Sequence, residues 1–227
     1  KITKTIGKIY SKIIKAGIFY AKSIEVAETA KAIENAQRDI NIAFVNEISL
    51  LCQKLNISVY DVLETARTKW NFLPFQPGLV GGHCIGVDPY YLAYIAKKLG
   101  SSADVILSGR RLNDNMTSII FKKIEKQVSL KSRILQIGIS FKENVPDIRN
   151  SKAAELAKQF ITKKYKIDIY DPVVNSLEVN HTFGIKLSKL RGKYDFIIIA
   201  VSHKFLLKDN IDILKYTKNS TKVFDIT

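Results

Sequence analysis

Residues 23–55 constrain the fold most, because this long run contains neither glycine nor proline. Apolar side chains recur in it every three or four residues, at Ile33, Ala36, Ile40, Phe44, Ile48, Leu51 and Leu55. This spacing predicts one long amphipathic helix with a continuous apolar stripe. A second face of the same helix carries Lys31, Asn35 and Arg38.

Shorter helices are predicted on either side of a loop. Ser58, with Asp61 three residues later, is typical of a helix start. Asp88 and Pro89 begin another helix that should stop at Gly100, and residues 104–127 contain few helix breakers. The chain before about residue 128 is therefore expected to be helical apart from a loop at 70–88.

The apolar period changes after residue 128. Short apolar runs at 133–138, 166–171, 185–187, 194–201 and 222–226 predict strands, and the runs 151–164 and 206–216 predict helices between them. Strands that alternate with helices favour a parallel sheet of the doubly wound type. We expect an α/β protein with two domains, one helical over 1–128 and one sheet-based over 129–227.

The composition limits the possible partners and compartments. A formal net charge of +15 favours anionic partners. However, the lysines are spread along the chain and form no zinc-finger, RNA-binding or recognition-helix pattern, so a nucleic-acid binder is only a minor alternative. No apolar stretch approaches the ~20 residues that span a bilayer. With only two cysteines, a reducing, cytoplasmic setting is expected.

The two cysteines have different surroundings. Cys52 lies among leucines at helical spacing and is expected to be core, whereas Cys84 lies in the glycine-rich stretch GLVGGHCIGVD. Glycines let a backbone approach a ligand closely, and a helix start or His83 could lower the pKa of a nearby thiol. Spacing alone leaves a reactive thiol and an incidental cysteine equally open. His83 has no cluster of further ligands, so no metal site is predicted.

Three segments resemble the UDP-glucose/GDP-mannose dehydrogenase family. They are FQPGLVGGHCIGVDPYYL (75–92), AETAKAIENAQRDINIAFVNE (27–47) and GISFKENVPDIRNSKAAEL (138–156), in the family's order. The Ile-Gly-Val-Asp after the cysteine is similar to the branch that acts on UDP-N-acetyl-D-glucosamine or -galactosamine. The resemblance implies a helical central domain, which forms a homodimer through the long helix, and a Rossmann-like UDP-binding domain.

The resemblance also implies a chemistry. The family oxidises a primary alcohol to a carboxylate with two NAD⁺, through a thiohemiacetal and a thioester on a cysteine that corresponds to Cys84. Lys31 and Asn35 match residues that hold a water or the developing oxyanion, and Asp88 matches the acid that orients them. Arg38 and Glu34 adjoin that face without a role of their own.

The substrate in this resemblance is a UDP-N-acetylhexosamine. Phe75, Gly78, Gly81 and Gly82 lie in the segment that approaches the sugar, and Phe141, Lys142 and Arg149 match the family's residues at the UDP site. Arg67 lies where a family arginine reaches the neighbouring subunit. Asp171 ends the second predicted strand, where a dinucleotide fold would bind ribose. In this family that domain takes UDP instead, and His203 is expected to be structural or supporting.

The sequence also departs from the family pattern. The family's NAD-binding domain, with its GxGxxG turn, has no counterpart here, and a basic residue common near the position of Thr227 is missing. We therefore expect part of a 6-dehydrogenase of surface-polysaccharide synthesis, inactive alone because NAD binds to the missing domain. A natural, non-catalytic UDP-sugar-binding or assembly module is the alternative.

Overall fold

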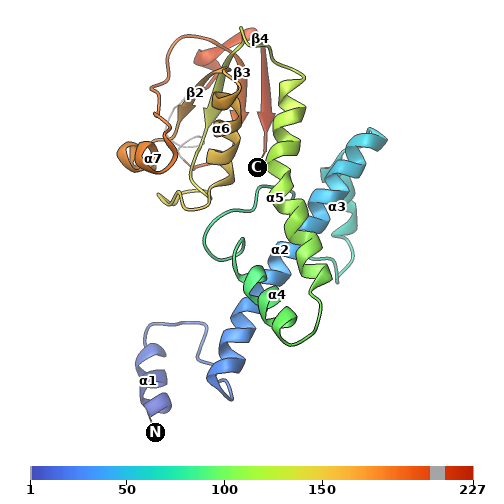
Figure 1. Cartoon of the computed structure of the whole chain (residues 1–227), viewed down its shortest axis with the longest axis vertical. Helices are drawn as coiled ribbons and strands as arrows, with labels where there is room; N and C mark the ends of the chain where they lie inside the picture. Colours follow the sequence, from blue (N-terminus) through green and yellow to red (C-terminus); the bar gives the residue numbers. More distant parts are fainter. Residues whose placement is uncertain (1, 205–212, 227) are drawn as a thin grey trace.

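The computed structural model describes residues 2–204 and 213–226, in which a helical unit is joined to a sheet-based unit (Figure 1). The elements in chain order are α1 (Ile2–Tyr10), α2 (Ile24–Leu55), α3 (Val59–Ala66), α4 (Asp88–Lys98), α5 (Asp104–Glu125), β1 (Arg133–Ile137), α6 (Lys152–Thr162), β2 (Lys166–Tyr170), α7 (Ser176–Phe183), β3 (Tyr194–Ile199), the 3₁₀ turn η1 (Ile213–Tyr216) and β4 (Thr217–Asp225). The predicted class, a helical part followed by a parallel α/β part, is confirmed.

The long helix α2 is set by its caps as well as by the absence of breakers. The Ser23 side chain accepts a hydrogen bond from the Val26 N–H at its start, and Asn56 ends it in a left-handed conformation. α2 packs against α3, α4 and α5, whereas α1 lies apart from these helices (Figure 1). The helical unit is therefore organised around one element.

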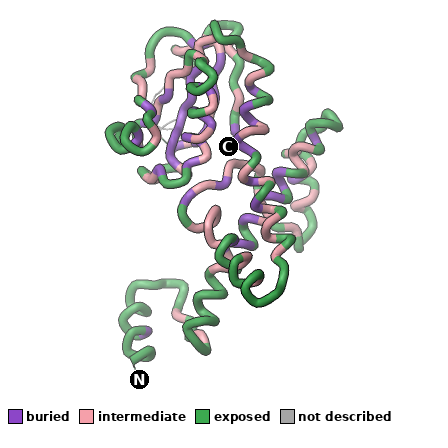
Figure 2. Tube along the Cα trace, in the orientation of Figure 1, coloured by how far each residue is buried: buried purple, intermediate pink, exposed green. Residues whose placement is uncertain are grey.

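Only part of the apolar stripe on α2 is buried in this chain. Ala36 and Cys52 are in the core, as expected for Cys52, but Ile33, Phe44 and Leu55 are each more than half exposed. In Figure 2 most of the helical unit is green, which marks exposed residues, whereas the strands β1 and β3 of the sheet unit are largely purple, which marks buried ones. The exposed side chains remain available to another surface.

The four strands form one parallel sheet in the order β2-β1-β3-β4. In β1, Ile134 packs against α5 and α6 on one face, and Leu135 and Ile137 belong to the core on the other face. This alternation is the two-residue period of a strand buried on both sides. α5 spans both units, because it contacts α2 and its later residues Phe121 and Ile124 pack under the sheet.

One predicted strand is wrong. Residues 185–187 have no regular secondary structure, and the preceding residues form α7, which was not predicted. The Asn175 side chain accepts from the Leu177 and Glu178 N–H groups at the start of α7, and Gly184 ends it in a left-handed conformation. Ile185 then packs into the core as an anchor of the loop. Most of the predicted helix at 206–216 lies outside the described residues, and its last part is η1.

Candidate functional site

The thiol loop, defined here as residues 78–88, is fixed at its start by a buried amide. Asn46 on α2 accepts a hydrogen bond from the Gly78 N–H at 2.9 Å and donates to the Gly78 carbonyl at 3.0 Å. At the other end, the Cys84 carbonyl accepts from the Val87 and Asp88 N–H groups as α4 begins. Cys84 is half-buried and has no disulfide partner.

The loop brings Asp88 to the polar face of α2. Asn35 donates to Asp88 at 2.5 Å, across 53 positions in the chain. Lys31 lies 3.4 Å from the Asn35 amide oxygen and forms a closer ion pair, 2.6 Å, with Glu34. The structure thus gathers an ammonium, an amide and a carboxylate at the end of the loop that carries Cys84.

The same loop packs against the turn between β1 and α6, residues 138–151. The Gly82 N–H donates to the Asn150 carbonyl at 3.4 Å, and the Asn150 amide donates back to the Gly82 carbonyl at 3.3 Å. Gly82 has φ +85, and a Cβ there would lie 2.8 Å from the Phe141 ring. A Cβ on Gly81 would lie 2.5 Å from the Asn150 carbonyl oxygen. Gly81 is therefore required by the close approach of two backbones, and Gly82 by its positive φ and by the Phe141 ring packed against it.

Charged side chains surround the contact between the thiol loop and the turn at 138–151. Arg149 forms hydrogen bonds with Asp147, which lower the pKa of that carboxyl from 3.8 to about 2. The hydrogen bond to the Asp147 carboxylate in turn raises the pKa of Arg149. His83 lies 3.7 Å from Asp147, and Lys142 is exposed above the Phe141 ring.

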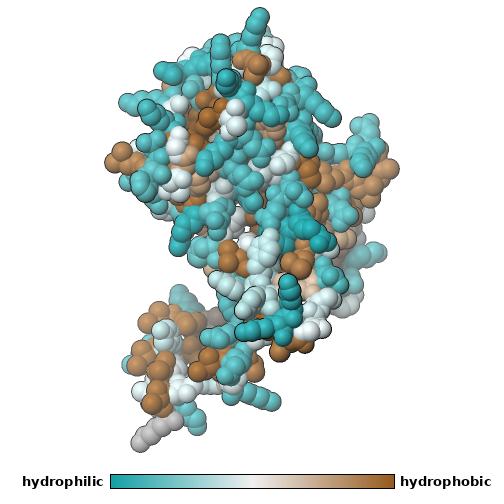
Figure 3. All heavy atoms as spheres, viewed as in Figure 1, coloured by the Kyte–Doolittle hydropathy of each residue, from teal (hydrophilic) through white to brown (hydrophobic). Residues whose placement is uncertain are grey.

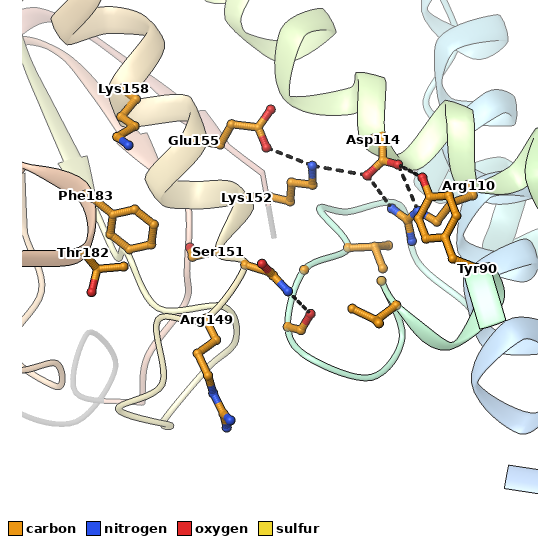
Figure 4. A pocket seen from close by; sticks show the side chains of 16 residues that line it. Tyr90, Arg110, Asp114, Arg149, Ser151, Lys152, Glu155, Lys158, Thr182 and Phe183 are labelled. Carbon is orange, nitrogen blue, oxygen red and sulfur yellow. Dashed lines mark hydrogen bonds and ion pairs between the residues drawn. The ribbon is translucent and has the colours of Figure 1, made fainter. Parts of the chain in front are cut away.

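A cavity of about 700 Å³ opens between the two units (Figure 4). Its walls come from the thiol loop, α4, α5, α6 and α7, and include Arg110, Arg149, Lys152 and Phe183. Cys84 itself does not line it. The N-terminus of α6, capped by the Ser151 side chain, forms part of the wall, and such a helix end favours anions.

A buried polar network beneath the loop was missed by sequence reasoning. Asn46 donates to Asn113, which donates to Asp39, and Asp39 also accepts from the fully buried Arg110. Burial raises the pKa of Asp39, against the opposing effect of Arg110. The sequence did contain a signal, because Asp39 and Asn46 lie seven residues apart on one face of α2, and Arg110 and Asn113 lie three residues apart on one face of α5.

Two other predicted residues have local roles. Arg67 donates to the Phe75 carbonyl at 3.3 Å within its own chain. Asp171 is buried, and its carboxylate accepts from the N–H groups of Ile139, Ser140 and Val173. Burial would raise the pKa of Asp171, but hydrogen bonds, first from His203, outweigh that effect and lower it. This carboxylate therefore organises the strand ends.

Residues 2–204 and 213–226 contain no group of three or more His, Cys, Asp or Glu arranged to hold a metal ion. Within the same ranges, no helix combines the length and apolarity that crossing a membrane requires. The position of Thr227, where a basic contact was expected, lies outside them.

Two family models match the chain. The central domain of the UDP-glucose/GDP-mannose dehydrogenase family matches residues 25–115, and its UDP-binding domain matches residues 135–227. The UDP-N-acetyl-D-glucosamine 6-dehydrogenase of Salmonella typhi is 45% identical over 100% of this chain and 55% of its own length. The enzyme of that name from Pseudomonas aeruginosa is 43% identical over 89% of this chain and 50% of its own length.

A solved structure agrees with these matches. The UDP-N-acetyl-mannosamine dehydrogenase Cap5O from S. aureus superimposes with a TM-score of 0.77 and 25% identity, over 98% of this chain and 56% of that one. The chain spans about half the length of the curated relatives it matches.

Proposed function

Because the chain belongs to the UDP-glucose/GDP-mannose dehydrogenase family, we propose that it supplies the acyl-transfer and UDP-binding parts of a UDP-N-acetylhexosamine 6-dehydrogenase. The observation that carries this proposal is the convergence around one loop. Asn35 and Asp88 meet at one end of the thiol loop, and Gly82 in its middle packs on the turn that carries Phe141 and Arg149. A sugar held by its UDP group on that turn would lie next to Cys84.

The proposed chemistry uses Cys84 as a nucleophile. Its thiolate adds to the C6 aldehyde of the sugar, forming a C–S bond and an oxyanion that takes up a proton. Loss of a hydride from this thiohemiacetal to NAD⁺ bound by another domain would leave a thioester, and attack by water would then release the carboxylate and the thiol. Asn35 and Lys31 would stabilise the oxyanion, an effect worth ~2.7–4 kcal/mol per donor in one measured case. Asp88 would orient the water and accept its proton.

NAD⁺ would accept the hydrides in both oxidation steps of such an enzyme. The described residues do not fit NAD, because Asp171, which ends β2 where a dinucleotide fold binds ribose, is buried and already accepts three backbone N–H groups. We therefore assign no hydride step to this chain. Turnover is expected only where these two domains are joined to an NAD-binding domain.

The partner proposed for the exposed part of the α2 stripe is a second copy of the chain. Phe44, Leu51 and Leu55 are half or more exposed, and Figure 3 shows apolar atoms gathered beside α3. A two-fold axis that passes beside this stripe would bring the stripes of two chains together, so that each covers the other, as in isologous interfaces. Sedimentation of the chain should report a dimer that Phe44→Glu dissociates; a wild-type monomer would contradict this.

Calorimetry with UDP tests the proposed nucleotide site on this chain. UDP should bind the wild type, and Lys142→Ala should weaken binding about tenfold by removing a charge-assisted contact. Lys131→Ala, an exposed lysine outside the site, is the matched control. The proposal fails if UDP does not bind, or if both lysine variants behave alike. In an enzyme that also carries an NAD-binding domain, Cys84→Ser should stop acid production while leaving UDP binding intact.

A further inference from the structure

Asp114 lies where three helices and both units of the chain meet. Its carboxylate accepts from the Tyr90 hydroxyl on α4 at 2.8 Å and from Arg110 Nη2 on α5 at 3.1 Å. Lys152, in the first turn of α6, places its Nζ 3.3 Å from the same carboxylate (Figure 4). One side chain therefore joins the helix that follows the thiol loop to the UDP-binding domain.

The charged groups around Asp114 favour a fixed position of its carboxylate. Burial alone would raise the pKa of Asp114, but hydrogen bonds from Arg110 and Tyr90 outweigh burial and lower it. The carboxylate is therefore ionised at neutral pH, and its hydrogen bonds are of the stronger, charge-assisted kind. Arg110 is 1% exposed, so it cannot move to solvent without breaking its buried pair with Asp39.

The same network is bonded to the start of the thiol loop and to a residue just beyond its end. Asn46 holds Gly78 at the start. At the end, Tyr90 follows the loop in the first turn of α4 and donates to Asp114. The loop that carries Cys84 is thus held near both of its ends by one set of connected polar groups.

We propose that Asp114 is a positioning residue for Cys84. Through Tyr90 and Arg110 it holds the thiol loop in place, and through Lys152 it ties that place to the UDP-binding domain. The catalytic purpose of this role rests on the proposed function, but the effect of Asp114 on the thiol loop can be tested without it. Because Tyr90 and the Asp114 carboxylate are both partly exposed, losing their hydrogen bond should act mainly on the loop. Losing Asp114 itself would also leave the buried Arg110 with only Asp39 as a carboxylate partner, so Tyr90→Phe isolates the effect on the loop.

The test uses the chain as it exists and the reactivity of its thiols. Cys52 is 3% exposed and serves as an internal reference that iodoacetamide should reach only on unfolding, whereas Cys84 is half-buried. Tyr90→Phe removes the hydroxyl that holds the loop end, and Tyr91→Phe removes a neighbouring exposed hydroxyl as the matched control. Asp114→Asn removes the charge with little change of shape.

Loss of one charge-assisted hydrogen bond should let the loop open about tenfold more often. The alkylation rate of Cys84 should therefore rise by up to that factor in Tyr90→Phe and in Asp114→Asn. It should not change in Tyr91→Phe. The urea midpoint should stay constant in Tyr90→Phe and Tyr91→Phe, whereas Asp114→Asn should also lower it, because this variant takes a charged partner from the buried Arg110. The proposal is overturned if the Cys84 rate is unchanged or lower in the first two variants, or if Cys52 accelerates equally in Tyr90→Phe, which would indicate global destabilisation.

A second measurement tests the link to the other domain. Bound UDP should slow alkylation of Cys84 in the wild type, and Lys152→Met should reduce this protection while UDP still binds. Equal protection in Lys152→Met and wild type would refute the link. If calorimetry shows that UDP does not bind the wild type, the proposed function fails, and the comparison of Tyr90→Phe with Tyr91→Phe still decides the positioning role.

Discussion

Replacing His203 with glutamine should loosen the turn that carries Phe141 and Lys142. His203 is fully buried after β3, and its Nδ1 accepts from the Asn144 N–H at 2.9 Å. Its Nε2 lies 3.1 Å from Asp171 Oδ2. Since an N–H group points at Nδ1, this nitrogen carries no proton, and Nε2 is the donor to the carboxylate.

The free energy that the substitution should cost depends on which ring nitrogen of His203 the new amide side chain can replace. Glutamine can place an N–H near Nε2 and keep the bond to Asp171, but it has no acceptor at the Nδ1 position. The Asn144 N–H then loses its partner, which costs about 1–3 kcal/mol for a buried donor. Asn144 is itself exposed, so we expect the lower half of this range, about 1–2 kcal/mol, or a factor of 5–30 in an opening equilibrium.

Hydrogen exchange provides the assay, because it measures the turn separately from the helical unit. Exchange of the Asn144 amide should accelerate 5–30-fold in His203→Gln. His203→Asn, whose amide oxygen can lie near Nδ1, should restore most of the protection. His181→Gln on the exposed face of α7 is the control. Equal protection of Asn144 in His203→Gln and wild type would refute this account of the turn.

Two further predictions concern the contact between the thiol loop and the turn at 138–151. Gly82→Ala should weaken UDP binding and accelerate exchange of residues 138–151, because the new Cβ needs a positive φ and the space of the Phe141 ring; normal binding would show that this contact is not needed. The Asp147 carboxyl should titrate near pH 2 by NMR. Because its pKa is depressed below 3.8, its stabilising contribution is full above about pH 4 and lost as the pH falls through about 2. Arg149→Ala should return this pKa toward 3.8, and no change would refute the assigned cause.

The sequence predicted best those elements whose signal is local. α2 begins and ends within one residue of the expected limits, because its length, its Ser23 cap and the absence of breakers all agree. Ser58 likewise caps α3, as its spacing to Asp61 indicated. In contrast, α7 is short and its residues are mostly polar, so its period was too weak to detect. The run at 185–187 is apolar because Ile185 anchors a loop, which composition cannot distinguish from a strand.

The sequence could predict which residue types form the candidate site, but not which of them are in contact. The contact between Asn35 and Asp88 joins positions that helical periodicity assigns to separate elements, so a resemblance to a family was needed to relate them. The role of Asp171 shows the opposite case. Its place at a strand end suggests a ribose ligand, but the fold directs three backbone N–H groups at its carboxylate instead.

The buried network is not explained by stability alone. A buried ion pair such as Arg110–Asp39 is often no more stabilising than apolar side chains of the same volume, because both charges must be desolvated. Apolar side chains, however, could not bind the N–H and carbonyl of Gly78 or the hydroxyl of Tyr90. A loop with four glycines loses much conformational entropy when it is fixed, and directional bonds at its start and end limit the positions it can adopt. The position of Cys84 therefore depends both on the polar contacts beneath the loop and on the glycines that let it pack against the turn at 138–151.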